Sequence, residues 1–228
     1  MRLFQFYFVS TPIGNLGDFS ERAAVTLRDV DLILAEDKRK TGILLSRYKI
    51  NTKLRAYHDH NKKRVTPDVI KGLNEGLRMA LVTDGGTPLI SDPGFYLIRE
   101  LIKNDIEFTV VPGPTAPISA LVLSGFPPDR FTFFGYMPRK KGKKEKLIEK
   151  AGKRKETSIF FESPYRLLKT LEYIERVLGD RDVVVARELT KRYEDIRRGR
   201  VSELIEYFSS KKVKGEITLL IKGNAGNK

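Results

Sequence analysis

Short apolar runs and amphipathic segments alternate along the first 136 residues of the chain. The runs have the length and the aromatic and β-branched content of buried strands, and the segments between them carry apolar residues at helical spacing. Strands are expected at 4–10, 31–35, 53–57, 79–82, 108–111 and 131–136, with helices at 21–30, 42–48, 67–75, 93–103 and 118–123. This repeated strand–helix order predicts a mostly parallel sheet with helices on both faces.

The rest of the chain follows a similar but less regular pattern. Strands are expected at 157–161, 183–186 and 217–221, an extended basic segment that could close a hairpin at 193–199, and helices at 165–178 and 201–208. Between the halves, residues 139–155 carry ten Lys and Arg against Glu145 and Glu149. Such a run indicates a basic linker leading into a helix, or simply a solvated charged surface. The chain is therefore expected to form two α/β domains, 1–136 and 137–228.

A glycine-rich loop follows the apolar run at 79–82 and reads Thr83-Asp84-Gly85-Gly86-Thr87-Pro88. The next helix is expected to begin near residue 91, where Ser91 or Asp92 can cap it and Pro93 suits its first turn. Ligands of open α/β sheets bind at the carboxyl ends of the strands, which is where this loop lies. On the loop alone, a tight turn that binds nothing is an equal alternative.

Charged residues after the strand at 31–35 form a second candidate site. Glu36 and Asp37 precede three cations, among them Arg39, at the same sheet edge as Asp84. A solvated loop is the commoner role of such a cluster. Its position on the edge expected to bind ligands favours contact with a substrate instead.

His58 and His60 flank an aspartate after the strand at 53–57. Two histidines at i and i+2 without a third nearby donor seldom bind a metal, so no metal is expected. Contact with an anionic substrate is the preferred interpretation.

The overall charge points to a polyanionic partner. The chain of 228 residues has 43 Lys and Arg against 29 Asp and Glu, a net charge of +14, and no cysteine. Nucleic acid is therefore favoured over a merely soluble, Lys/Glu-rich surface, and the lack of cysteine excludes disulfides and thiolate sites. The apolar start at 3–9 is too short for an export signal, and no run is long enough to span a membrane, so a cytoplasmic protein is expected.

The residues taken alone do not name a reaction. No P-loop, G-x-S-x-G, zinc or kinase signature is present. They predict a basic α/β protein with two domains and a cleft between them, the default place for a small-molecule site.

A resemblance adds the chemistry. The chain matches one family, in order, at 11–16 (TPIGNL), 35–42 (AEDKRKTG), 58–61 (HDHN), 83–88 (TDGGTP), 91–94 (SDPG), 112–114 (PGP), 161–163 (FES), 186–191 (ARELTK) and 214–216 (KGE). It resembles the bacterial ribosomal RNA small subunit methyltransferase I family, which are ribose 2′-O-methyltransferases of the tetrapyrrole-methylase superfamily. Two departures are Lys38, where the family usually has Thr, and Gly85, where it usually has Ala. Neither changes an expected ligand.

The resemblance implies two α/β domains of the tetrapyrrole-methylase type, with S-adenosylmethionine bound in the cleft between them. It also implies a homodimer that methylates a cytidine 2′-hydroxyl in the decoding region of small-subunit ribosomal RNA, as naked RNA or as the assembled small subunit. Carried over by position, the cofactor contacts are expected at Pro12, Asp84, Gly85, Gly86, Thr87, Thr115 and Ala116, and at the backbone near Glu162, Ala186 and Gly215.

A base or polarising cation should assist the transfer, because a ribose hydroxyl is a poor nucleophile. We expect Asp37, Arg39 and His58 near the ribose, with Glu36 orienting them. Two other functions stay open: methylation of a small tetrapyrrole, and RNA binding without catalysis. The basic run at 139–155 argues against the first, and the glycine–proline loops gathered at one sheet edge argue against the second.

Overall fold

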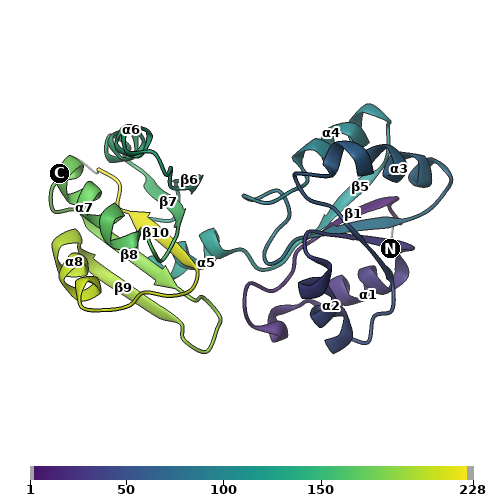
Figure 1. Cartoon of the computed structure of the whole chain (residues 1–228), viewed down its shortest axis with the longest axis horizontal. Helices are drawn as coiled ribbons and strands as arrows, with labels where there is room; N and C mark the ends of the chain where they lie inside the picture. The colour runs from purple at the N-terminus through teal and green to yellow at the C-terminus, as the bar shows by residue number, and fades with distance from the viewer. Residues whose placement is uncertain (1–2, 225–228) are drawn as a thin grey trace. The chain divides into compact units, whose positions relative to one another are not determined.

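The computed structural model of the chain describes residues 3–224 and divides into two compact units. The first ends at Thr115 and the second begins at Ala116. Each unit contains its own five-stranded sheet with helices on both faces (Figure 1). The expected α/β class with two units is therefore confirmed.

The first sheet is entirely parallel, with the strand order β3-β2-β4-β1-β5. Its strands are β1 (Phe6–Val9), β2 (Leu32–Ala35), β3 (Lys53–Ala56), β4 (Met79–Val82) and β5 (Phe108–Val111). Strands β1 and β4 are buried along their whole length, as expected for central strands covered on both faces. Because all five run in the same direction, their carboxyl ends share one edge.

Two pairs of helices cover this sheet. The pair α1 (Glu21–Asp29) and α2 (Lys38–Arg47) packs on one face, and α3 (Lys62–Asn74) and α4 (Phe95–Lys103) pack on the other (Figure 1). A short 3-10 helix, η1 (Leu16–Asp18), precedes α1. Ser20 caps α1, since its hydroxyl accepts a hydrogen bond from the amide of Ala23.

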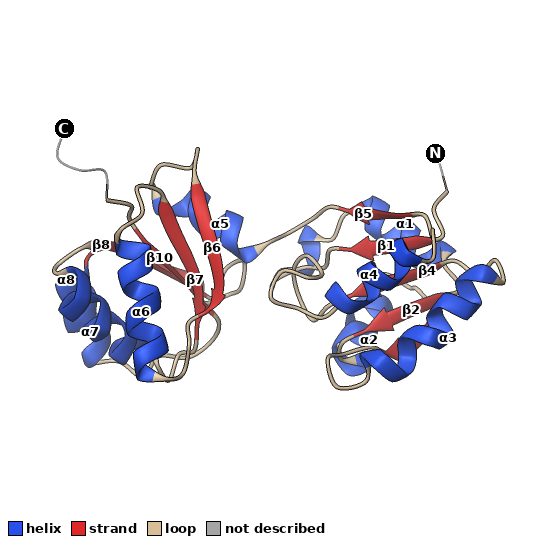
Figure 2. Cartoon of the chain, turned by 90° about the horizontal axis from the view of Figure 1, so that it is seen from above, coloured by secondary structure: helices blue, strands red, loops and turns tan. Residues whose placement is uncertain are grey.

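The second sheet is mixed, with the order β6-β7-β10-β8-β9. Its strands are β6 (Phe131–Tyr136), β7 (Thr157–Glu162), β8 (Asp182–Arg187), β9 (Asp195–Arg200) and β10 (Ile217–Ile221). Only β6 and β7 pair in parallel, and β8 and β9 form the antiparallel pair expected of the basic extended segment. Helices α6 (Lys141–Gly152), α7 (Leu167–Leu178) and α8 (Val201–Ser209) cover one face, and α5 (Ala116–Ser124) lies on the other (Figure 2).

The predicted boundary between the domains, after residue 136, is too late. Strand β6 pairs with β7 of the second sheet, and α5 packs on that same sheet. Strand periodicity does not say which neighbour a strand pairs with, so β6 was assigned to the wrong half. The basic run at 139–155 is consequently not a linker: most of it is α6, inside the second unit.

Several helices start at other residues than expected. Helix α2 begins four residues earlier, at Lys38, because Asp37 caps it, and α3 begins at Lys62, with Pro67 inside it. Helix α4 begins later, at Phe95, after Gly94 in the left-handed region at φ 134°. Gly94 itself takes the cap position, in place of the expected Ser91 or Asp92. A Cβ there would lie 2.8 Å from Leu89 Cδ1 and 2.9 Å from Leu81 Cδ2, so a larger residue does not fit.

Candidate active site

The loops after β1 and β4 meet at the carboxyl edge of the first sheet. Thr11 and Gly86 exchange two backbone hydrogen bonds of 2.9 Å, and the Thr11 hydroxyl donates to the carbonyl of Thr83 at 3.1 Å. A Cβ at Gly85 would lie 3.1 Å from the carbonyl oxygen of Pro12. The structure thus brings together the Pro12 and Gly85–Gly86 positions that were expected to contact a cofactor.

The loop after β5 joins them through hydroxyl groups. The Ser10 and Thr87 hydroxyls lie 3.0 Å apart, and the Thr87 hydroxyl donates to the carbonyl of Pro114 at 3.4 Å. Thr115 follows directly. The Thr83 hydroxyl is buried and has no hydrogen-bond partner within the described residues. Because buried polar groups are normally hydrogen-bonded, this hydroxyl is available to bond to a ligand at this edge.

Asp84 connects the β4 loop to the start of α2. One carboxylate oxygen accepts the backbone N–H of Asp37 at 3.1 Å, and the other accepts Lys40 Nζ at 2.7 Å. The backbone N–H of Asp84 in turn donates weakly to Glu36 Oε2 at 3.4 Å. Lys40 was not singled out from the sequence, because in a row of three cations nothing local distinguishes the one that reaches across 44 residues.

Asp37 and Arg39 form a closed pair. The Asp37 carboxylate accepts the backbone N–H of Arg39 at 2.8 Å, and the guanidinium lies 3.2 Å from its second oxygen. Hydrogen bonds from Arg39 hold the pKa of Asp37 below its usual range. The Arg39 side chain is otherwise 91% exposed, which leaves it open to an anionic ligand. Asp37 therefore caps α2 and is a weak base.

Glu36 has the opposite character. It is half-buried, and its only hydrogen bond among the described residues is the long one from the amide of Asp84. Burial, followed by the nearby negative charge of Asp84, raises the pKa of Glu36 above its usual value. A carboxylate with few donors and a raised pKa is suited to accept a proton.

His58 follows β3, the neighbour of β2, and so lies on the same edge. Its backbone N–H donates to the Asn61 side chain at 2.9 Å, and its ring lies 5.9 Å from that of His60. The Nδ1 atom is buried without a hydrogen-bond partner in the described part of the chain, where no hydrogen bond or ion pair joins the ring to Asp37 or Arg39. Across residues 3–224, no group of three or more acidic, His or Cys residues could hold a metal ion.

In the second unit, the side chain of Glu162 is fully buried at the end of β7. It accepts hydrogen bonds from the Ser163 amide at 2.6 Å and the Thr170 hydroxyl at 2.5 Å, and it pairs with Arg166 at 2.6 Å and Lys144 at 3.6 Å. The carboxylate is thus fully occupied within its own unit.

Lys144 is the member of this network that the sequence analysis missed. It looks like any other cation of the run at 139–155, yet its side chain is only 4% exposed. Burial lowers its pKa. Its spacing with Ile148 and Ala151, which are buried on the same helix, is the signal that could have identified it.

Two further expected cofactor positions lie at strand ends of the second sheet. Ala186 pairs with Thr218 in β10, and Gly215 precedes that strand with φ 89°. A Cβ at Gly215 would overlap the side chain of Glu188, whose carboxylate accepts the Glu216 amide and Lys191 Nζ, both at 2.9 Å. Gly215 is therefore required for this packing. Ala116 opens α5.

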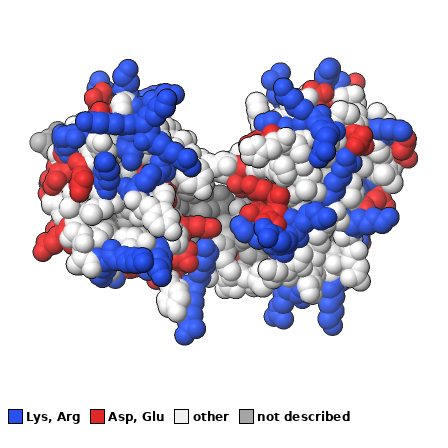
Figure 3. All heavy atoms as spheres, in the orientation of Figure 1, with Lys and Arg blue, Asp and Glu red and all other residues white. Residues whose placement is uncertain are grey.

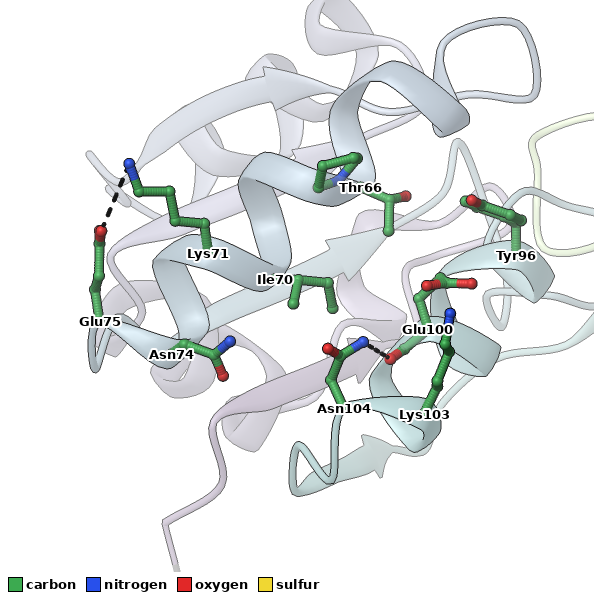
Figure 4. Close-up of a pocket in the computed structure, with 10 residues that line it drawn as sticks. Thr66, Ile70, Lys71, Asn74, Glu75, Tyr96, Glu100, Lys103 and Asn104 are labelled. Carbon is green, nitrogen blue, oxygen red and sulfur yellow. Dashed lines mark hydrogen bonds and ion pairs between the residues drawn. The ribbon is translucent and has the colours of Figure 1, made fainter.

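A groove of about 600 Å³ between α3 and α4 is a different feature (Figure 4). None of the predicted site residues lines it. Two of its polar side chains interact with neighbours at its ends, Lys71 with Glu75 and Asn104 with the carbonyl of Glu100. It is thus separate from the strand-end loops.

Comparison with known proteins decides the family. The model of the tetrapyrrole (corrin/porphyrin) methylases matches residues 5–205. The chain belongs to this family. The ribosomal RNA small subunit methyltransferase I of Thermotoga maritima is 46% identical to it over 215 residues, which cover 94% of this chain and 96% of the relative. The proteins of the same name from Halalkalibacterium halodurans and Rickettsia prowazekii are 44% identical over 218 residues, 96% of this chain and 75% and 78% of theirs.

The resemblance inferred from the motifs is therefore confirmed, as is the assignment of this tetrapyrrole-methylase family member to the methyltransferases. A solved structure agrees on the fold: uroporphyrin-III-C-methyltransferase from Thermus thermophilus has a TM-score of 0.66 at 19% identity, over 95% of this chain and 93% of the other. Between residues 3 and 224, no helix combines the length and apolar character needed to cross a membrane.

Proposed function

We propose that the chain transfers a methyl group from S-adenosylmethionine to the 2′-hydroxyl of a cytidine in the decoding region of small-subunit ribosomal RNA. Family membership and the names of relatives at 44–46% identity over most of the chain carry this proposal. By the same reasoning we expect a cytoplasmic homodimer. The cofactor contacts are proposed at Pro12, Asp84, Gly85, Gly86, Thr87, Thr115, Ala116, Glu162, Ala186 and Gly215.

The first-unit loops suit an adenosyl ligand. The close approach of Gly85 to Pro12 leaves backbone rather than side chains at this edge, and the unpartnered Thr83 hydroxyl offers a buried polar contact. When bound, S-adenosylmethionine supplies an electrophilic methyl group on a sulfonium. The loops would hold it in line with the acceptor oxygen, and such positioning accounts for much of the rate of a two-substrate transfer.

Glu36 is the carboxylate that fits proton removal best. The ribose hydroxyl must lose its proton as the oxygen–carbon bond forms and the carbon–sulfur bond breaks. Asp37 is occupied with capping α2 and pairing with Arg39, whereas Glu36 has one weak hydrogen bond and a raised pKa. We therefore assign Glu36 as the base and Asp37 as the residue that positions Arg39. We assign the exposed Arg39 guanidinium and His58 to contacts with the ribose and its phosphates.

The test uses radiolabelled S-adenosylmethionine and small ribosomal subunits that lack this ribose methylation. Label on a cytidine 2′-oxygen supports the proposal. Cofactor binding without label on the subunit would indicate a small tetrapyrrole-like acceptor instead. If neither cofactor binding nor label is detected, the protein binds RNA without catalysis.

Two isosteric variants test the roles of the carboxylates. Glu36→Gln should abolish single-turnover transfer while cofactor affinity is kept. Asp37→Asn keeps an acceptor oxygen for the helix cap, so it should retain a measurable rate with weaker RNA binding. Full activity of Glu36→Gln would remove Glu36 from the chemistry.

A further inference from the structure

Lys and Arg side chains extend from both units on the face shown in Figure 3, so charge alone does not select an RNA-binding surface. Ion pairing does. The second unit has two basic segments, β9 with its flanks and the run at 139–155, and their Lys and Arg content does not distinguish them as RNA-binding candidates. The structure separates them by what their cations already contact.

The arginines of β9 are engaged within the protein. Arg197 lies 2.7 Å from Asp195 and over the ring of Tyr207, and Arg198 donates to the carbonyl of Leu123. Arg200 lies 3.4 Å from Asp180 and also pairs with Asp182. This segment therefore holds the sheet edge and its neighbouring helices together, and two of its three strand arginines, Arg197 and Arg200, are already paired with carboxylates.

Most of the positive charge in the run at 139–155 is not paired with a carboxylate. Lys144 is buried in the Glu162 network and Arg154 pairs with Glu156. Eight other cations are exposed and form no ion pair within residues 3–224: Arg139, Lys140, Lys141, Lys143, Lys146, Lys150, Lys153 and Lys155. Lys143, Lys146 and Lys150 recur at helical spacing and so form one row on the exposed face of α6.

The placement of these cations does not serve stability. Lys140 and Lys141 stand at the start of α6, and its first turn has no acidic residue. Cations at a helix N-terminus oppose the helix dipole, which favours anions there. A row of unpaired lysines that also begins at the unfavourable end of its helix is better explained by an anionic partner.

Aromatic side chains precede this run on the edge strand β6. The ring of Tyr136 lies 5.3 Å from that of Phe161, which also contacts Phe133 at 5.0 Å, so the tyrosine is supported from within the sheet. Tyr136 is nevertheless 61% exposed, and only four residues separate it from α6. An exposed, supported aromatic ring beside cations is the arrangement that single-stranded RNA-binding proteins use to stack bases and hold phosphates.

We propose that Tyr136, Arg139, Lys140, Lys141, Lys143 and Lys146, here called the β6–α6 surface, bind an unpaired segment of the RNA substrate. The tyrosine stacks on one base and the cations contact the phosphates that flank it. The inference deepens the proposed function and relies on it for the identity of the RNA. It assigns no RNA contact to β9.

The test measures binding of a fluorescent single-stranded oligoribonucleotide across a range of salt concentrations. Replacing Lys140, Lys141 and Lys143 together by Gln should make the negative slope of log K against log salt shallower by about 2, since each single-strand phosphate contact contributes about −0.7. A matched control replaces Arg47, Lys53 and Lys103 by Gln, three exposed cations of the first unit with the same charge change. The control should keep the wild-type slope.

Tyr136→Leu tests stacking without changing charge. It should weaken binding of the single strand roughly ten-fold and leave binding of duplex RNA unchanged. The proposal would be overturned if the control triple variant showed the same change in salt dependence, or if Tyr136→Leu bound the single strand with unchanged affinity. Loss of S-adenosylmethionine affinity in Tyr136→Leu would also overturn it, because the ring would then belong to the cofactor site.

The outcomes distinguish this inference from the proposed function. If the wild type binds the single strand through the β6–α6 surface but transfers no methyl group to the small subunit, the RNA-binding surface is supported and the proposed activity is refuted. If the wild type methylates the subunit and the triple Gln variant does so equally well at low and high salt, the proposed activity is supported and the RNA-binding surface is refuted.

Discussion

Replacing Glu162 by glutamine removes the negative charge from the buried cluster that it forms with Lys144 and Arg166. The Glu162 carboxylate is fully buried, and the Lys144 side chain is 4% exposed. In the variant, the ammonium group keeps its hydrogen bond to the Thr170 hydroxyl at 2.6 Å but loses its counter-charge. Arg166 is less affected, because it is 25% exposed and also donates to the carbonyl of Met137.

The size of the effect follows from which charge is left behind. Breaking a buried ion pair by removing one partner costs about 3–5 kcal/mol, because the remaining charge is desolvated without compensation. Lys144→Met should cost about 1 kcal/mol or less, since Glu162 still has Arg166 and two hydrogen-bond donors. In the double variant neither charge is stranded, so its cost should be smaller than the sum of the two single costs by about 2 kcal/mol.

Urea unfolding followed by circular dichroism would measure the four free energies of unfolding in this cycle. The matched comparison is internal, since both single variants remove one charge from the same cluster. If Glu162→Gln costs less than about 1 kcal/mol, or if the two substitutions are additive within about 0.5 kcal/mol, the reasoning about the stranded ammonium is refuted.

Three further changes test other parts of the structure. Gly215→Ala should lower the free energy of unfolding by about 2 kcal/mol, because φ is positive and the new Cβ overlaps Glu188, whereas Gly142→Ala in α6 meets nothing and should raise it by about 0.5 kcal/mol; equal effects would contradict this. Ser20→Ala should cost about 1 kcal/mol in thermal or urea unfolding through the lost cap of α1, and a cost near zero would refute that role. Burial lowers the pKa of Lys144 in the folded protein, so below about pH 10.4 the folded state loses the Lys144 proton before the unfolded state does. The free energy of unfolding of the wild type should therefore rise relative to that of Lys144→Met between neutral pH and about pH 10. A difference that stays constant with pH would disprove this.

Much of the first unit could be predicted because its signals are local. Strand length, helical spacing and the cap at Ser20 are all read within a few residues, and the strand–helix order then requires parallel strands. Parallel strands end at one edge, which is why the loops at Pro12, Gly86 and Thr87 could be expected together from their order alone.

The roles within that edge were less accessible. Asp37 and Glu36 are adjacent carboxylates, and the sequence analysis gave Asp37 the place at the ribose. In the structure Asp37 is held by Arg39 and caps α2, whereas Glu36 lies beside Asp84, which is 48 residues away. The proton affinity of Asp37 is therefore set by its near neighbour Arg39, whereas that of Glu36 depends on burial and on a distant residue, which no local pattern reveals.

The sequence by itself determined the order and type of the elements, the sheet edge at which the motifs collect, and, through those motifs, the family. Tertiary structure alone decided that β6 joins the second sheet, that Lys144 is buried while its neighbouring cations are exposed, and that Arg197 and Arg200 of β9 pair with carboxylates within the protein. The reason is the range of the interactions. Periodicity and capping act between neighbours in the chain, whereas strand pairing, burial of a charge and ion pairing are settled between residues that only the folded chain brings together.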